Sequence, residues 1–178
     1  MSSADAVSRL RPFVPADAPA VARRVRESLA QLSPWMPWAT PEYGEPEAAA
    51  FIASTATGRT HEFAIEVEGE LAGACGLNTI DHSTRRANLG YWIATPRSGR
   101  GYVSRSVRAL VDWTFAETDF ERLEIVVGVG NEPSRRVAER VGAIREGVLE
   151  RRVWVRSLPG VEPTLESAIL YSLVRPRP

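Results

Sequence analysis

One segment, Leu89-Gly-Tyr-Trp-Ile-Ala-Thr-Pro-Arg-Ser-Gly-Arg-Gly-Tyr-Val-Ser-Arg-Ser-Val-Arg-Ala-Leu-Val111, sets the architecture of the chain. It begins with a run rich in aromatic and branched residues, which predicts a strand, and continues into a turn rich in proline and glycine. From Gly101 onward apolar residues recur at helical spacing, which predicts an amphipathic helix. This order suits phosphate binding, because glycine lets backbone N–H groups approach a ligand and the start of a helix carries unpaired donors at the positive end of its dipole.

Two well-known nucleotide-binding patterns are excluded at this turn. A P-loop requires Gly-Lys-Ser/Thr after its glycines, and no such sequence follows here. The dinucleotide fingerprint requires Gly-x-Gly-x-x-Gly, but Ser104 stands in the place of the third glycine. Three arginines, Arg97, Arg100 and Arg105, add positive charge around the turn. The segment therefore favours a pyrophosphate ligand of another kind.

Together with two later motifs, the turn resembles the GNAT superfamily of acetyl-CoA-dependent N-acetyltransferases. The three motifs are Arg97-Ser-Gly-Arg-Gly-Tyr-Val103, Asn131-Glu-Pro-Ser134 and Val141-Gly-Ala-Ile-Arg-Glu-Gly147. Within the superfamily the chain is similar to the RimJ/RimL branch, which acetylates the N-terminal amines of proteins. The resemblance runs from Leu10 to Val174. It implies an α/β fold with a single mixed, mostly antiparallel sheet, in which two central parallel strands splay apart between flanking helices.

The resemblance also implies which residues bind acetyl-CoA. The superfamily pattern Gln/Arg-x-x-Gly-x-Gly/Ala falls on the pyrophosphate-binding residues Ser98, Gly99, Arg100, Gly101, Tyr102 and Val103, with departures at Ser98 and Val103. The pantetheine arm is expected in the gap between Gly90–Ile93 and Ile125–Val129. There, backbone groups near Trp92 and Ile93 would pair with it and direct an N–H group at the thioester oxygen, where it would stabilise an oxyanion. Asn131 and Ser134 complete the expected cofactor contacts.

A proton donor for the leaving thiolate is implied on the helix that follows Asn131. Many superfamily members use a tyrosine there, but the matching position is Ala138. In the RimJ/RimL branch a serine at this Asn-x-x-Ser position is associated with the leaving sulfur, so the resemblance implies Ser134 as the catalytic donor or a pantetheine contact. By residue type alone, Asn131 or Ser134 fits a helix N-terminal cap equally well, and the two roles are compatible.

The general base has no matching residue. The glutamate that resembling enzymes place on the strand after this helix falls on Val153. Four acidic residues lie in or beside predicted strands, and each has a solvated surface position as its alternative: Glu62, Asp81, Glu124 and Glu150. A dedicated base is also dispensable for an N-terminal α-amine, whose pKa of about 8 leaves it partly neutral at physiological pH. That consideration favours an α-amine over a lysine side chain as the acceptor.

A loop with two tryptophans is the candidate acceptor site. In Leu32-Ser-Pro-Trp-Met-Pro-Trp38 the two prolines end a helix and leave Trp35 and Trp38 in a loop. Such residues either plug the edge of a core or line a ligand cleft, and the resemblance implies the acceptor side. Three acidic residues beside the loop would suit a polycationic acceptor: Glu42, Glu45 and Glu47.

The favoured function is acetyl transfer from acetyl-CoA to a primary amine by direct attack, with a protein or peptide N-terminus as the acceptor. The alternatives are a small amine acceptor, such as a polyamine, amino acid or aminoglycoside, and a non-catalytic acyl-CoA sensor. The sensor is suggested by four departures from the superfamily pattern, at Ser98, Val103, Ala138 and Val153. A third alternative is a partner-binding surface around exposed Trp35 and Trp38.

Composition limits the number of domains and the kinds of ligand and partner that the chain is expected to have. The 178 residues fit one domain over 1–178, and equal totals of 22 basic and 22 acidic residues give no field that would attract nucleic acid or an anionic membrane. No signal peptide or membrane-spanning stretch is evident, so a cytoplasmic location is expected. The single Cys75 lies in an apolar segment and is expected to be a buried structural thiol, while His61 and His82 lack neighbouring ligands, so no metal is expected.

The remaining pattern predicts further elements. A helix is expected from a cap at Pro15-Ala-Asp17 to Leu32, and another over Glu45–Ala56 with Ala49, Phe51, Ile52 and Ala56 in the core. The right-handed crossover rule places the strand after the central helix parallel to the strand before it. Antiparallel edge strands near the C-terminus would allow a homodimer. The predicted strands are Leu10–Val14, Phe63–Val67, Leu71–Leu77, Ala87–Ile93, Leu123–Val129, Ala143–Val155 and Thr164–Val174, and the other helices are Gly101–Glu117 and Asn131–Val141.

Overall fold

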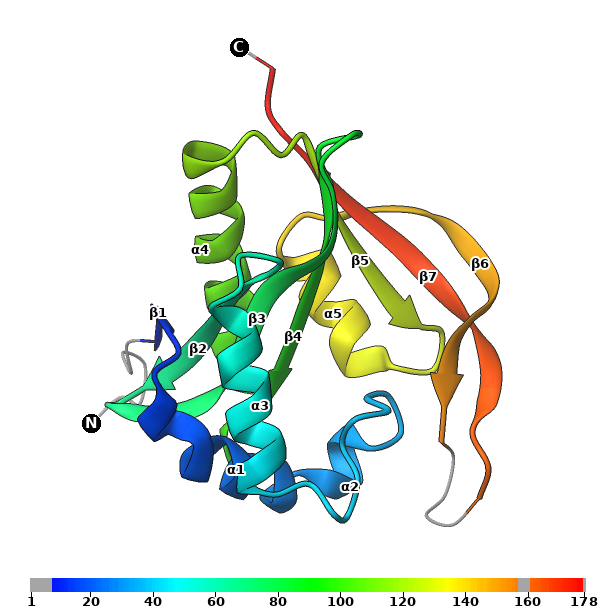
Figure 1. Cartoon of the computed structure of the whole chain (residues 1–178). Coiled ribbons are helices and arrows are strands. Elements are labelled where there is room, and N and C mark those ends of the chain that lie inside the picture. The colour runs from blue at the N-terminus through cyan, green and yellow to red at the C-terminus, as the bar shows by residue number, and fades with distance from the viewer. Residues whose placement is uncertain (1–7, 157–160, 178) are drawn as a thin grey trace, which may run out of the picture.

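The computed structural model describes residues 8–156 and 161–177, and its centre is a seven-stranded sheet (Figure 1). Residues 1–7, 157–160 and 178 lie outside these ranges, and so does the segment Leu158-Pro-Gly160, whose proline and glycine predict a loop between the last two strands. The strands follow the order β1-β2-β3-β4-β5-β7-β6 across the sheet. Their bounds are β1 Ser8–Pro12, β2 His61–Val67, β3 Glu70–Asp81, β4 Arg86–Ile93, β5 Arg122–Gly128, β6 Ile144–Val155 and β7 Thr164–Val174.

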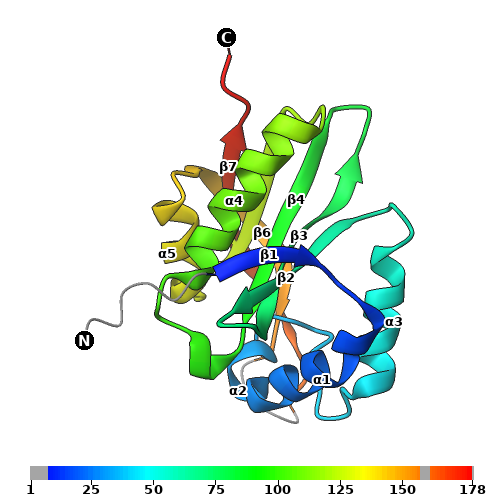
Figure 2. The ribbon, with the colours of Figure 1, turned by 90° about the vertical axis from the view of Figure 1, so that its left-hand side faces the viewer.

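Helices cover both faces of the sheet (Figure 2). On one face α4 places Val107 and Leu110 in a buried cluster with Leu77 and Leu89 of the strands. On the other face α1 and α3 pack against a second cluster that contains Trp92. The helices are α1 Ala18–Glu27, α2 Leu29–Leu32, α3 Glu45–Thr55, α4 Tyr102–Glu117 and α5 Glu132–Arg140, with short 3-10 turns η1 Pro15–Asp17 and η2 Thr95–Arg97. None of these helices is long and apolar enough to cross a bilayer.

The central feature of the sheet is the parallel pair β4–β5. It is the one parallel pair among the described strands, and its pairing covers only Arg86–Asn88 against Arg122–Glu124. Beyond that point β4 stays paired with β3 as far as Ile93, and β5 stays paired with β7 as far as Gly128. The two strands therefore diverge, as Figure 1 shows, and the predicted splay is confirmed.

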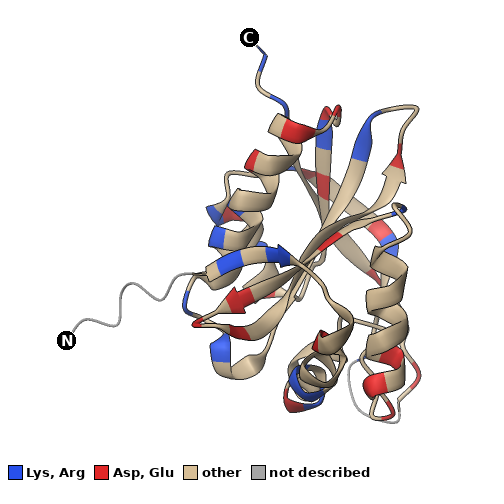
Figure 3. Ribbon diagram, turned by 60° about the vertical axis from the view of Figure 1, so that its left-hand side comes forward, with Lys and Arg blue, Asp and Glu red and all other residues tan. Residues whose placement is uncertain are grey.

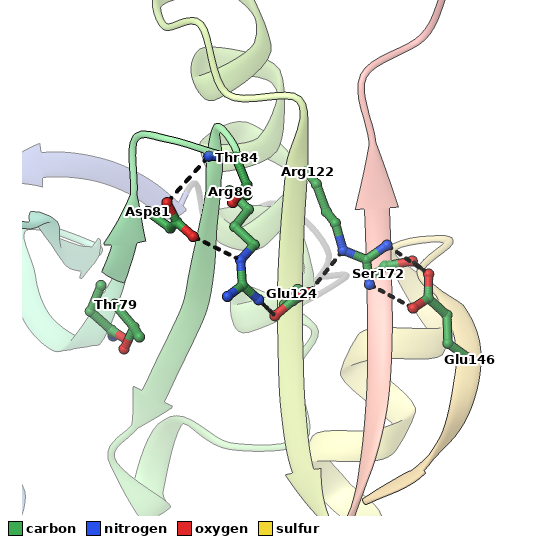
Figure 4. A network of polar contacts seen from close by, with 9 residues as sticks. Thr79, Asp81, Thr84, Arg86, Arg122, Glu124, Glu146 and Ser172 are labelled. Carbon is green, nitrogen blue, oxygen red and sulfur yellow. Dashed lines mark hydrogen bonds and ion pairs between the residues drawn. The ribbon is translucent and has the colours of Figure 1, made fainter.

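A network of charged side chains crosses the sheet where β4 and β5 remain paired (Figure 4). Arg86 lies 3.5 Å from Asp81 and 3.3 Å from Glu124, and Arg122 lies 2.8 Å from Glu124. Arg122 also forms a two-pronged ion pair with Glu146 of β6, with N–O distances of 2.8 and 2.6 Å. The network thus connects the end of β3, through β4 and β5, to β6.

The helices depart from prediction in two places. The helix expected to run through to Leu32 is interrupted at Ser28, which is 1% exposed and whose hydroxyl accepts the backbone N–H of Thr95 at 2.9 Å. That bond draws the chain out of helical geometry to anchor the loop after β4. In α3 the buried positions are Ala48 and Ile52, whereas Ala49 and Ala56 are exposed.

Candidate active site

Two cavities meet where β4 and β5 diverge. The larger, of about 700 Å³, extends toward α3 and the tryptophan loop, and the smaller, of about 330 Å³, extends toward the glycine turn and α5. Both contain residues of the gap itself, so the space between the strands joins them. Six residues line both cavities: Trp35, Met36, Tyr91, Trp92, Asn131 and Ser134.

The glycine turn forms one end of the smaller cavity. Gly99 and Gly101 have φ values of 74° and 76°, a left-handed conformation that residues with a Cβ rarely adopt. Gly101 is the N-terminal cap of α4 and contributes no side chain, so the N–H groups of the first turn remain free for a ligand. Five of the six predicted pyrophosphate-binding residues line this cavity, namely Ser98, Gly99, Gly101, Tyr102 and Val103, whereas Arg100 is exposed outside the lining.

Positive charge at this end comes from sources other than those predicted. Arg97 is paired with Glu68 at 2.8 Å and Glu70 at 3.1 Å, so its charge is balanced within the protein. Arg105 stacks over the ring of Tyr102 with its guanidinium carbon 5.0 Å from the ring centroid. Two arginines of α5, to which the sequence did not point, line this cavity together with Arg97: Arg140, and Arg136, which is paired with Glu132.

The backbone of β4 presents free amides to the gap. The N–H of Ala94 donates to the carbonyl of Ala72, on the β3 side, at 2.8 Å. Because successive peptide groups of a strand point to opposite edges, the amides of Tyr91 and Ile93 face away from β3 and toward the gap. The Ile93 carbonyl at that edge accepts a bond from Gln31 of α2 at 3.3 Å. The indole of Trp92 lines the gap, while its own amide points to β3.

Ser134 lies at the junction of the cavities, beside a tyrosine. Asn131 provides the cap of α5, because its side-chain oxygen accepts the Ser134 N–H at 3.3 Å. The Ser134 hydroxyl is therefore not needed as the cap. Its oxygen lies 3.0 Å from the phenol oxygen of Tyr91, and the phenol donates its one proton to the Ser134 carbonyl, also at 3.0 Å, or to this hydroxyl.

Tyr91 is the site residue that sequence reasoning missed. It was included in the strand that opens the key segment, but nothing in its spacing pointed to a residue on α5. Burial raises the pKa of Tyr91, so the phenol keeps its proton and remains a donor at neutral pH. Ala138, where other superfamily members carry a tyrosine, is completely buried in the α4 cluster and faces neither cavity.

The four acidic candidates for the general base lie in different surroundings. Asp81 accepts bonds from the Ser83 hydroxyl and from Thr84 in the turn after β3, and these bonds lower its pKa; it also lies 3.5 Å from Arg86. Glu124 is held between two arginines, and Glu150 is exposed on β6. Glu62 alone of the four lines the larger cavity, where burial raises its pKa to about 7.

The two tryptophans of the loop both line the larger cavity. Trp35 packs on the glycine-rich end of β5, where a Cβ at Gly128 would come within 2.9 Å of its ring. Trp38 is 41% exposed and lies against Tyr43 and Trp92, with ring centroids 5.5 and 6.1 Å away. Trp35 thus closes the end of β5, and both rings also form a cavity wall.

Acidic residues mark the start of α3, beside this loop (Figure 3). Glu47 lines the larger cavity, and its carboxylate accepts the Gly44 N–H at 2.9 Å. Glu42 and Glu45 are exposed outside the lining. One carboxylate of the three predicted there therefore reaches the cavity.

The cysteine and histidines lie apart from the site. Cys75 is fully buried, as predicted, and burial raises the pKa of its thiol. His61 packs against Trp113 and His82 stacks on Phe120, with ring centroids 5.5 and 6.2 Å apart. Within residues 8–156 and 161–177, no three His, Cys, Asp or Glu side chains gather as a metal-binding group.

Solved structures share this architecture. A RimL, described as a ribosomal L7/L12 alpha-N-protein acetyltransferase in complex with coenzyme A, superposes with a TM-score of 0.86 at 22% identity over 96% of both chains. RimJ of Mycobacterium smegmatis in complex with CoA-disulfide gives a TM-score of 0.85 at 27% identity, over 95% of this chain and 82% of that one.

Sequence relatives carry acetyltransferase names. The putative ribosomal N-acetyltransferase YdaF of Bacillus subtilis is 33% identical over 108 residues, which cover 61% of this chain and 56% of YdaF. The ribosomal-protein-serine acetyltransferase of Escherichia coli is 34% identical over 89 residues, half of each protein. Spermidine N(1)-acetyltransferase of Escherichia coli is 28% identical over 93 residues, 52% of this chain and 50% of that protein. The chain spans about half the length of the curated relatives it matches.

The acetyltransferase (GNAT) domain family matches residues 8–144, which run from β1 to the start of β6 and include the glycine turn, the gap and Ser134. By this match the chain belongs to the GNAT acetyltransferase family.

Proposed function

We propose that this chain transfers the acetyl group of acetyl-CoA to the N-terminal α-amine of a protein or peptide. The observation that carries the proposal is the junction of the two cavities, where a free backbone amide of β4 and the Ser134 hydroxyl lie beside one gap. One cavity leads from this junction to a phosphate-binding turn, and the other leads to an aromatic pocket. A transferase needs this arrangement, because donor and acceptor must reach one point from different directions.

The donor side fits acetyl-CoA by its chemistry. The free N–H groups at the start of α4 suit a pyrophosphate, and Arg140 of α5 supplies positive charge beside it. The gap between β4 and β5 is lined by unpaired strand edge, which suits the amide-bearing pantetheine arm. The complex of RimJ with CoA-disulfide supports the same ligand class.

At the reacting carbon the protein contributes electrostatics and a proton. The Ile93 amide, directed into the gap, would stabilise the oxyanion that forms when an amine attacks the thioester. Ser134 would give its hydroxyl proton to the departing sulfur. Tyr91, at 3.0 Å from the Ser134 oxygen, would donate a hydrogen bond to that oxygen as it becomes negative.

A protein N-terminus suits the acceptor cavity because the cavity is open, aromatic and acidic. Trp35, Trp38 and Tyr43 offer apolar walls to a peptide, and Glu47 and Glu62 attract an ammonium group. The names of YdaF and of the Escherichia coli ribosomal-protein-serine acetyltransferase support this acceptor class, and a ribosomal protein would place the reaction in the cytoplasm.

One observation favours a second acceptor class. The carboxylates of the larger cavity, with Glu42 and Glu45 beyond its lining, would also attract a polyamine. The similarity to spermidine N(1)-acetyltransferase supports this alternative.

The test combines calorimetric titration with acetyl-CoA and a thiol-release assay on three acceptors. These are a peptide with a free N-terminus, the same peptide with a blocked N-terminus and a free lysine, and spermidine. We expect micromolar binding and thiol release with the first peptide only. Release with spermidine alone would replace the acceptor class, and binding without release on any amine would identify a sensor.

A further inference from the structure

Glu62 extends over β3 because Gly76 has no side chain there, and Gly90 leaves room for Asn78 beside it. The strand register aligns Glu62 with Gly76 of β3, and Gly76 with Gly90 of β4. A Cβ at Gly76 would lie 2.0 Å from a Glu62 carboxylate oxygen, so the carboxylate occupies the space directly above Gly76. His61 packs on the α4 face, so by alternation Glu62 lies on the opposite face, the one that carries Trp92.

Two asparagines hold the carboxylate in place. The Asn78 oxygen accepts the Asn88 amide at 2.9 Å and the Thr79 hydroxyl at 3.2 Å. Its NH₂ group is therefore the end left to donate to Glu62, and this hydrogen bond favours the charged carboxylate. Glu62, Asn78 and Asn88 all line the larger cavity.

The charge of Glu62 is uncompensated. Neither lysine nor arginine lines the larger cavity, and within the described chain no arginine forms an ion pair with Glu62. Glu66, on the same strand, is in contrast paired with Arg9 and Arg11. The titratable groups around Glu62 are Glu47 and Tyr43 from the α3 side, Tyr91 of β4 and Cys75 of β3.

We propose that Glu62 is the general base of the reaction, receiving through water molecules in the larger cavity the proton that the acceptor ammonium must lose before it attacks. This inference rests on the proposed amine acetylation. The Glu62 carboxylate takes one N–H proton and releases it to solvent after turnover. The nitrogen then bonds to the acetyl carbon, and the C–S bond breaks with its electron pair on sulfur, which Ser134 protonates. The second proton that the nitrogen loses restores the Ser134 hydroxyl.

The sheet geometry is compatible with this reach. Neighbouring strands lie about 4.8 Å apart, so a carboxylate above β3 is roughly one strand spacing from β4 and the near edge of the gap. Glu62 is level with Gly90, which precedes Ile93 by three residues, or about 10 Å along the strand, so a short chain of water molecules would carry the proton from the amine to Glu62. Proton removal then takes place on the Trp92 face of β4, and proton delivery by Ser134 and Tyr91 on the other face. Burial raises the pKa of Glu62 to about 7, close to the value that suits a base at neutral pH.

The test is the pH dependence of kcat/KM for Glu62→Gln, measured by thiol release with an amine that the native protein acetylates. We expect a loss of about a hundredfold at pH 7.5 with unchanged affinity for acetyl-CoA. The native profile should rise to an inflection near pH 7 that is absent from the variant. Glu150→Gln, which alters an exposed carboxylate on β6, is the matched control and should leave rate and profile unchanged.

A second variant keeps the inference testable if Glu62→Gln does not fold. Asn78→Ala removes the hydrogen bond that favours the charged carboxylate, so the inflection should move to higher pH. An unmoved inflection in Asn78→Ala, a retained inflection in Glu62→Gln, or a rise in KM without a fall in kcat would overturn the assignment. If the native protein acetylates no amine, the proposed function itself fails, and that outcome is distinct from an active protein that is indifferent to Glu62.

Discussion

The two ends of the β4–β5 pair differ in how they treat charge. At the paired end every acidic residue of the network faces an arginine: Asp81 and Glu124 face Arg86, and Glu146 faces Arg122 (Figure 4). At the open end the larger cavity contains Glu62 and no basic residue. At the paired end the ion pairs hold neighbouring strands together. At the open end the carboxylate of Glu62 has no basic partner and is available to a ligand. The same two strands are thus linked by ion pairs at one end and line the candidate site at the other.

The divergence itself follows from pairing preferences. After Glu124, β5 continues its antiparallel register with β7 from Ile125 to Gly128, while β4 continues with β3. Each strand follows the twist of its own partner, so the two separate once the short parallel ladder ends. The ion pairs at the paired end oppose further separation. Substitutions at the open end should therefore change ligand binding or the rate of acetyl transfer. Substitutions at the paired end should change the stability of the fold.

The largest expected effect is at the glycine turn. Gly101→Asp places a Cβ and a carboxylate at φ 76°, where the free N–H groups of α4 face the smaller cavity. We expect affinity for acetyl-CoA to fall at least a hundredfold in calorimetric titration, because a buried like charge would face the pyrophosphate. Gly58→Asp, at φ 73° with no neighbour within 4 Å, is the control for backbone strain and should bind normally. A folded Gly101→Asp variant with native affinity would refute the cofactor assignment.

Ser134→Ala should give the next largest effect. Loss of the hydroxyl removes the donor for the leaving sulfur, so kcat should fall by roughly tenfold to a hundredfold while acetyl-CoA affinity is retained. The cap of α5 should survive, because Asn131 accepts the Ser134 backbone N–H. Steady-state kinetics and thermal unfolding measure the two quantities. Parallel losses in kcat and unfolding temperature would indicate that the hydroxyl serves structure alone.

Tyr91→Phe should reduce the rate less, by about fivefold to tenfold, since it removes one supporting hydrogen bond and leaves Ser134 in place. The paired variant Ser134→Ala/Tyr91→Phe separates the two roles. If Tyr91 acts through Ser134, the double variant should be no slower than Ser134→Ala. Additive losses in that cycle would show that Tyr91 acts independently.

The smallest effects concern stability, and their signs should be opposite at the two ends. The pKa of Glu146 is lowered to about 2, first by its bond with Arg122, so its contribution is present above an unfolded pKa of 4.5 and disappears as pH falls toward 2. The pKa of Glu62 is raised to about 7, so its ionisation increasingly costs stability as pH rises from 4.5 through 7.

These signs are checked by urea unfolding between pH 4 and pH 8. Glu146→Gln should be less stable than the native protein at pH 7, by no more than about 1 kcal/mol for an exposed pair, with a smaller deficit at pH 4. Glu62→Gln should gain stability relative to the native protein as pH rises over the same interval. Equal pH dependence in both variants would remove the distinction between the two ends.

Sequence patterns predicted an element well where the structure of that element depends on neighbouring residues alone. The glycines at 99 and 101 fit a left-handed turn, and helical spacing after Gly101 indicated the buried face of α4. In α3 Phe51 and Ile52 pack in the core as predicted, but Ala48 is buried instead of Ala49 and Ala56. Alanines at neighbouring positions carry little directional information, and the burial of Ala48 depends on how the helix is docked. The break at Ser28 was not visible either, since its partner Thr95 lies far along the chain.

What the sequence by itself determined is therefore the glycine turn, the strand and helix around it, and the spacing of Asn131 and Ser134, because φ preferences, periodicity and capping act over a few residues. The tertiary structure decided which side chains share the site. Tyr91 contacts Ser134, which lies 43 residues further along the chain, and Glu62 differs from the other acids because the strand register places Gly76 beneath its carboxylate. Contacts between residues so far apart in the sequence depend on strand order and register, which arise from the packing of the whole sheet rather than from any one segment.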